Sequence, residues 1–98
     1  VVGLMKDKDI HDIIREVKGI VSEWYACSPN MERAISANDL KELIFAETKS
    51  KVEAFKTVDL AVKEALREGN SDFVLIFGSF FTVSEAYESL SKLKQIEL

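Results

Sequence analysis

Continuous apolar runs alternate along this chain with segments in which apolar residues recur at helical spacing. The runs predict strands, and the segments between them predict helices. Residues 1–5 form an apolar run that predicts a strand. Over residues 10–20, isoleucine and valine recur at helical spacing, which predicts a helix with Asp9 as its N-cap. Residues 21–27 predict a second strand, which Pro29 ends because proline has no N–H to donate to a sheet.

The helical spacing returns twice in the middle of the chain. Residues 37–46 predict a helix that begins after Ser36, and residues 51–55 predict a brief strand. Thr57 then precedes a third helix, which Gly69 ends as a C′ residue. The expected apolar residues of that third helix are Leu60, Ala61, Ala65 and Leu66.

Residues 73–77 are a continuous apolar run rich in strand-forming side chains. Such a run predicts a strand buried on both faces, and we expect it at the centre of the core. Residues 78–81 follow as a turn. Thr82 and Glu85 have the spacing of a capping box, so they predict the start of a last helix that runs to about residue 94.

Strands and helices therefore alternate from one end of the chain to the other. This order predicts an α/β fold of three layers, in which a mostly parallel sheet carries helices on both faces. The 98 residues contain no internal repeat or low-complexity linker, and we expect residues 1–98 to form a single domain.

Charge and composition narrow the classes of partner. With 17 acidic and 13 basic side chains, the net charge of -4 disfavours nucleic acid and anionic lipid as partners. The run at 73–77 is far shorter than the ~20 residues that span a bilayer. The only cysteine, Cys27, and the only histidine, His11, make no zinc-ligand pattern. We expect a cytoplasmic protein in which Cys27 is a structural or merely exposed thiol and His11 is exposed.

Ligands of parallel sheets bind where the strands end at their carboxyl side, and the chain places charged residues after the first predicted strand. Lys6, Asp7, Lys8 and Asp9 offer ammonium donors and carboxylate acceptors within one turn. These groups suit an amino acid that carries both charges, or the ribose and phosphates of a nucleotide. A mixed charge run that caps a helix and faces water has the same composition, so both interpretations stay open.

Two further loops carry candidate binding groups. Gly78 permits close approach of the backbone, and the Ser79 hydroxyl lies beside a helix N-terminus, which favours a carboxylate or phosphate oxygen. A tight turn without a ligand would need the same residues. Arg33 is suited to bidentate binding of a carboxylate, or alternatively to holding its own loop.

Several of these segments occur together in one known family. Gly-Leu-Met-Lys-Asp-Lys-Asp begins at Gly3, Trp24-Tyr25 and the segment from Pro29 to Arg33 follow, and Gly-Ser-Phe-Phe-Thr-Val begins at Gly78. In this order they resemble the C-terminal domain of bacterial dihydrofolate/folylpolyglutamate synthases, members of the Mur ligase superfamily. The resemblance covers nearly the whole chain and implies a Rossmann-like domain.

The resemblance implies an ATP-dependent ligase with magnesium as its metal ion. In that family a folate or dihydropteroate carboxylate is activated as an acyl phosphate, which the amine of glutamate attacks. The family's N-terminal ATPase domain would hold the phosphates and magnesium, and would be the partner of this domain. The matching positions that would bind substrate or nucleotide are Asp7, Lys8, Asp9, Arg33 and Ser79; no catalytic or metal-ligating residue is carried over.

The chain also departs from the family pattern. It lacks a phosphate loop and the Asp-Gly-Ala-His-Asn-type motif that opens the family's C-terminal domain. We therefore expect a truncated domain that is inactive alone and leaves one sheet edge unpaired, which invites self-association. The alternatives are a stand-alone module that binds an anion or nucleotide at Gly78 and Ser79, or an interaction domain that uses Phe80 and Phe81.

Overall fold

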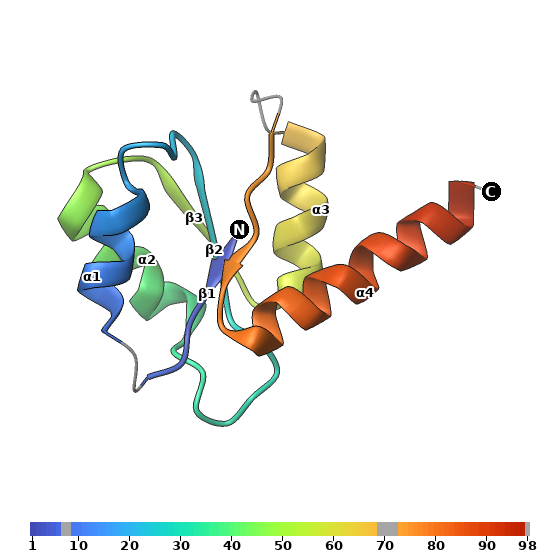
Figure 1. The fold of residues 1–98 in the computed structure, drawn as a ribbon, viewed down its shortest axis with the longest axis horizontal. Helices are drawn as coiled ribbons and strands as arrows, with labels where there is room; N and C mark the ends of the chain where they lie inside the picture. The colour runs from blue at the N-terminus through green and yellow to red at the C-terminus, as the bar shows by residue number, and fades with distance from the viewer. Residues whose placement is uncertain (7–8, 69–72, 98) are drawn as a thin grey trace.

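In the computed structural model, which describes residues 1–6, 9–68 and 73–97, strands and helices alternate as predicted (Figure 1). The elements are β1 (Val2–Gly3), α1 (Ile10–Val17), β2 (Trp24–Cys27), α2 (Ala37–Thr48), β3 (Val52–Phe55), α3 (Val58–Glu68), β4 (Phe77–Gly78) and α4 (Phe80–Glu97).

The strands form one sheet in the order β3-β2-β1-β4, and every pair of neighbours is parallel. Val2 of β1 pairs with Ala26 on one side and with Phe77 on the other. Helices α1 and α2 cover one face of the sheet, and α3 and α4 cover the other (Figure 1). The predicted three-layer α/β architecture with a parallel sheet is confirmed.

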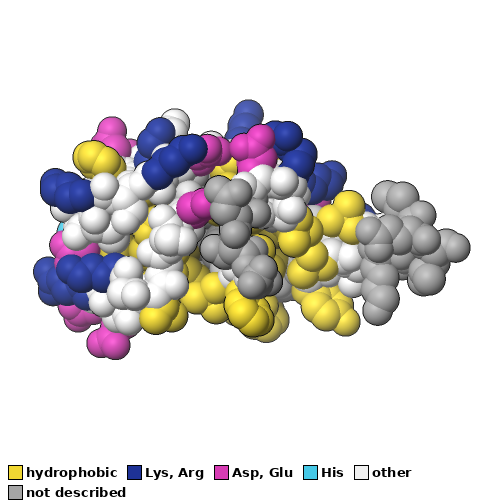
Figure 2. Space-filling view, turned by 90° about the horizontal axis from the view of Figure 1, so that it is seen from above, with side chains coloured by type: hydrophobic (Ala, Val, Ile, Leu, Met, Phe, Trp, Pro, Cys, Tyr) yellow, Lys and Arg dark blue, Asp and Glu magenta, His cyan; other side chains and the backbone are white. Residues whose placement is uncertain are grey.

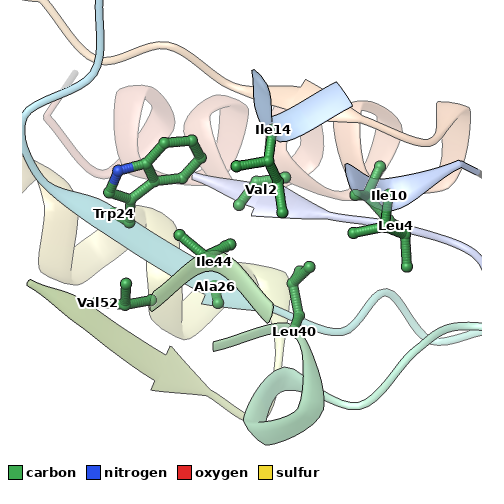
Figure 3. Packing of buried hydrophobic residues seen from close by; sticks show 9 residues of the cluster. All are labelled: Val2, Leu4, Ile10, Ile14, Trp24, Ala26, Leu40, Ile44 and Val52. Carbon is green, nitrogen blue, oxygen red and sulfur yellow. The ribbon is translucent and has the colours of Figure 1, made fainter. Parts of the chain in front are cut away.

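The larger core lies between the sheet and the helices α1 and α2 (Figure 3). Ile14, Leu40 and Ile44 point from these helices onto the sheet and are fully buried. Burial of a side chain of this size contributes about 1.5–3 kcal/mol each. Trp24 completes this core and meets the ring of Phe77 edge-on, with their centroids 6.3 Å apart.

Small side chains make the core on the other face of the sheet. Ala61 and Ala65 of α3 are buried together with Ala86 of α4, as the apolar spacing of α3 predicts. Leu60 and Leu66, which the same pattern also placed inside, are 49% and 51% exposed. The buried stripe of α3 is complete with its valines and alanines, so the two leucines fall beside it.

The prediction of a central, buried strand at 73–77 is wrong. Only Phe77 and Gly78 are in β4, which is an edge strand, and Phe73 is 89% exposed. Residues before β4 still run beside β1, since the Val1 nitrogen donates to the Leu75 carbonyl. An edge strand has no neighbour to cover its outer side. Figure 2, the view from above, shows hydrophobic side chains along the lower side of the molecule, from its middle to the right.

Several element bounds differ from those predicted. α1 ends at Val17 instead of residue 20, and Ile20 is 78% exposed in the turn before β2, which begins only at Trp24. α2 continues to Thr48, where Lys49 takes a left-handed conformation (φ 58°) and ends the helix. α4 extends to Glu97. The predicted end of α3 at Gly69 lies outside the described residues.

No helix within the described ranges has both the length and the apolar character needed to cross a membrane.

We predict that Gly3→Ala lowers the free energy of unfolding by about 1–3 kcal/mol, because overpacking a tight site forces neighbours apart. A Cβ at position 3 would lie 2.7 Å from Thr82 Oγ1 and 3.0 Å from the Cys27 carbonyl oxygen. Gly19→Ala is the matched control, since nothing lies within 4 Å of its Cβ. Urea unfolding of both variants measures the difference, and equal midpoints would contradict this packing.

Candidate functional site

Three loops meet where β1, β2 and β4 end, at the lower edge of the sheet in Figure 1. The carbonyl oxygen of Gly3 lies at the centre of this edge. It accepts hydrogen bonds from the Ser79 backbone N–H at 3.0 Å and from the Thr82 hydroxyl at 2.8 Å. The end of β1 is therefore joined directly to the start of α4, across most of the sequence.

The loop after β2 runs antiparallel to the residues that follow β1. Met5 and Ala34 form an isolated bridge, and the Lys6 N–H donates to the Arg33 carbonyl at 2.8 Å. The Ile35 N–H donates to the Leu4 carbonyl at 2.9 Å. This ladder brings two predicted loops together and places the exposed cationic residues Lys6 and Arg33 next to each other along the backbone.

The cap of α4 is Ser79, so the capping box predicted at Thr82 and Glu85 is wrong. The helix begins at Phe80, and the Ser79 hydroxyl accepts from the Thr82 N–H at 3.1 Å. Thr82 lies in the first turn and is fully buried, with its hydroxyl bonded to Gly3. Both serine and threonine can cap, and the buried acceptor at Gly3 decides which of them does.

The hydrogen bonds around Ser79 fix the direction in which its hydroxyl donates. Thr82 gives its only hydroxyl proton to the Gly3 carbonyl, which can only accept. The 3.0 Å contact between the two hydroxyls therefore has Ser79 as its donor. The Ser79 hydroxyl therefore donates to Thr82 and accepts from the Thr82 N–H, which leaves one lone pair on its oxygen. To donate to a ligand carboxylate, Ser79 would have to break its hydrogen bond to the Thr82 hydroxyl. The ligand contact of Ser79 stays a prediction.

The first charged loop is described only at its two ends. Asp9 caps α1 as predicted, because its Oδ1 accepts from the Asp12 N–H at 3.3 Å. A hydrogen bond with the Asp9 side chain, together with its charge, raises the pKa of Asp12. The candidate residues Asp7 and Lys8 lie outside the described residues. His11 is exposed on α1, as expected.

Cys27 is a buried thiol, which decides between the structural and the merely exposed thiol that the sequence left open. Its side chain is fully buried, and its Sγ lies 3.4 Å from the Val2 carbonyl, to which it donates. Burial raises the pKa of the thiol to about 12, from an ordinary value of 9.0. A thiol that stays protonated at neutral pH is a poor nucleophile, so Cys27 has a structural role.

A shallow hollow at the same edge of the sheet opens beside the N-terminus of α2, where the Ser36 hydroxyl caps the helix at 3.1 Å from the Asp39 nitrogen. Lys56 contributes to its wall from the loop after β3. Lys56 is not among the candidates that the sequence motifs indicate, although it stands directly after a predicted strand, where ligands of parallel sheets bind. A mostly apolar hollow lies at the opposite edge, lined in part by Ile20, Trp24, Tyr25, Phe73 and Leu75.

Comparison with known proteins decides the family. The model of the Mur ligase glutamate ligase domain matches residues 1–80. This chain belongs to that family. Two similar proteins are named dihydrofolate synthase/folylpolyglutamate synthase: one from Buchnera aphidicola subsp. Baizongia pistaciae, 35% identical over all of this chain, and one from Escherichia coli, 33% identical over 90% of it. No solved structure gives a significant match.

The chain spans only 23% and 20% of the lengths of these two relatives. The family match confirms the resemblance that the motifs at Gly3 and Gly78 indicate. In this Mur ligase domain the bonds of Ser79 and Thr82 to Gly3 join the start of the first motif to the second at the carboxyl edge of the sheet.

We predict that Ser79→Ala destabilises the domain by about 1 kcal/mol, since α4 loses its N-cap. Ser84→Ala is the matched control, because Ser84 is exposed on the same helix. Thermal unfolding followed by circular dichroism compares the two variants. If both unfold at the same temperature, the hydrogen bonds assigned to Ser79 do not contribute to stability.

Proposed function

We propose that this chain is the C-terminal, glutamate-binding part of an ATP-dependent ligase that adds glutamate to dihydropteroate or folate. The observation that carries the proposal is the ladder between the loops after β1 and β2. It holds Arg33 beside Lys6 at the edge of the sheet where parallel α/β domains bind ligands. Both side chains are cationic, and glutamate presents two carboxylates.

The family resemblance supports a two-step reaction. A substrate carboxylate oxygen attacks the γ-phosphorus of ATP, which gives an acyl phosphate and releases ADP. The glutamate amine then attacks the acyl carbon, the amide bond forms, and inorganic phosphate leaves. In this scheme Arg33 and Lys8 bind glutamate carboxylates, and Asp7 and Asp9 line the same loop. These residues orient the glutamate amine toward the acyl carbon, and holding the two reactants in this geometry raises the reaction rate.

ATP and magnesium are the cofactors in this proposal, and an N-terminal ATPase domain of the whole protein holds most of their contacts. The exposed cations Lys6 and Arg33 suit phosphate as well as carboxylate oxygens. Across residues 1–6, 9–68 and 73–97, no three His, Cys, Asp or Glu side chains gather into a metal site. We therefore assign no step through magnesium to this chain, and we propose that residues 1–98 form one domain that acts in the cytoplasm and is inactive alone.

A second candidate is a stand-alone module that binds an anion or nucleotide. The capped N-termini of α1, α2 and α4 all open at the carboxyl edge, where their dipoles favour negative charge. This module would bind ATP without any folate substrate. Calorimetric titration of the 98-residue chain with ATP discriminates the two candidates, and tight binding would favour the module.

We predict that the whole protein releases phosphate when it is given magnesium, ATP, glutamate and dihydropteroate or a reduced folate, and that the 98-residue chain does not. The reason is that the chain has no phosphate-loop motif. The assay is a coupled measurement of phosphate with product analysis by mass spectrometry. Release by the 98-residue chain alone would overturn the proposed division of labour.

We also predict that Arg33→Ala in the whole protein raises the glutamate KM by about tenfold to a hundredfold, as expected for loss of a charge-assisted hydrogen bond. The KM for ATP should change little. Arg67→Ala is the control, since Arg67 is an exposed cation near the far end of α3, paired with Glu64 and Glu68. Steady-state kinetics with each substrate varied in turn gives the values. Equal glutamate KM values in the two variants would remove Arg33 from the site.

A further inference from the structure

Side chains at the start of α4 bind both the end of β1 and the loop after β2. Ser79, Thr82 and Glu85 follow one another at intervals of three residues, so they share a side of the helix. Ser79 and Thr82 bind the end of β1 through the Gly3 carbonyl. Glu85 binds the loop after β2, because its Oε2 accepts from the backbone N–H of Asn30 at 2.8 Å.

The bond to Asn30 fixes one end of the turn that carries Arg33. Within this turn the Met31 N–H donates to the Pro29 carbonyl at 2.7 Å, and the Ala34 N–H donates to the Met31 carbonyl at 3.1 Å. The other end is fixed by the ladder to the residues after β1. Arg33 is thus presented on a short turn with both ends tethered, one to α4 and one to the residues after β1.

We propose that Glu85 is a positioning residue that sets where Arg33 meets the incoming amino acid. The inference rests on the proposed function and adds a residue that none of the family motifs contains. Glu85 acts through the backbone of the Asn30 turn, so it influences binding without touching the substrate. A carboxylate that accepts from an N–H makes a stronger bond than a neutral acceptor, and it restricts the turn accordingly.

A hydrogen-bond acceptor at position 85 is placed to hold the loop after β2 and has no role in capping α4. Glu85 is half-buried and lies in the second turn of α4, beyond the reach of a cap. Since Asn30 and Glu85 are 55 residues apart, no local pattern links them. When the acceptor is lost, the first half of the Arg33 turn keeps only its own short-range bonds, and the side chain samples more positions.

The test uses the whole protein with Glu85→Ala and Glu85→Gln. Glu88→Ala is the matched control, because it removes the same charge from an exposed position of the same helix. We expect Glu85→Ala to raise the glutamate KM roughly tenfold, within the hundredfold that a misplacement of about 1 Å can cause. The KM for ATP should stay constant. Glu85→Gln should restore most of the affinity, since its amide oxygen still accepts from Asn30.

Hydrogen exchange of the peptide that contains Asn30 gives a readout independent of activity. We expect faster exchange in Glu85→Ala than in Glu88→Ala or the wild type. Unchanged exchange would overturn the tether itself. Faster exchange with a glutamate KM equal to that of Glu88→Ala would overturn the positioning role. A wild-type protein that does not add glutamate would overturn the proposed function and the positioning role with it, while the exchange result would still report the tether.

Discussion

The carbonyl oxygen of Gly3 is the constraint on which the carboxyl edge of this domain depends. A carbonyl has two lone pairs, and here one accepts the Ser79 N–H and the other accepts the Thr82 hydroxyl. Both donors belong to the start of α4, so a single backbone atom fixes where the last helix begins relative to the first strand. Such a bond is strongest when water is excluded, and Gly3 and Thr82 are both buried.

The lack of a side chain at two positions makes this junction possible. Gly78 takes a positive φ of 123°, which L-residues rarely adopt, and this turns the chain from β4 into α4. A Cβ there would overlap the Gly3 carbonyl. The other side of Gly3 faces the Cys27 carbonyl and Pro29, so three strand ends approach more closely than larger residues would allow. The convergence of the loops follows from these two glycines.

Local features of this fold were predictable from the sequence, and features set by the strand order were not. Asp9 and Ser36 cap helices because their side chains reach N–H groups three residues away, which the sequence alone specifies. The run at 73–77 has the composition of a buried strand, yet its exposure depends on the place of β4 at the edge of the sheet. Likewise, the choice of Ser79 over Thr82 as the cap depends on an acceptor in β1. Asp9, Arg33 and Ser79 could be named as candidates from their motifs, whereas the tether through Glu85 joins distant segments and leaves no local pattern.

Main-chain bonds give this edge a tolerance to sequence change that side-chain contacts would not give. The ladder between Lys6 and Arg33, and that between Ile35 and Leu4, need only peptide groups. A relative that is 35% identical can therefore keep the same loop geometry with different side chains, provided that small residues remain at the junction. Glu85 is an exception, since it holds the backbone N–H of Asn30 with a side chain, so this end of the Arg33 turn depends on the residue at position 85.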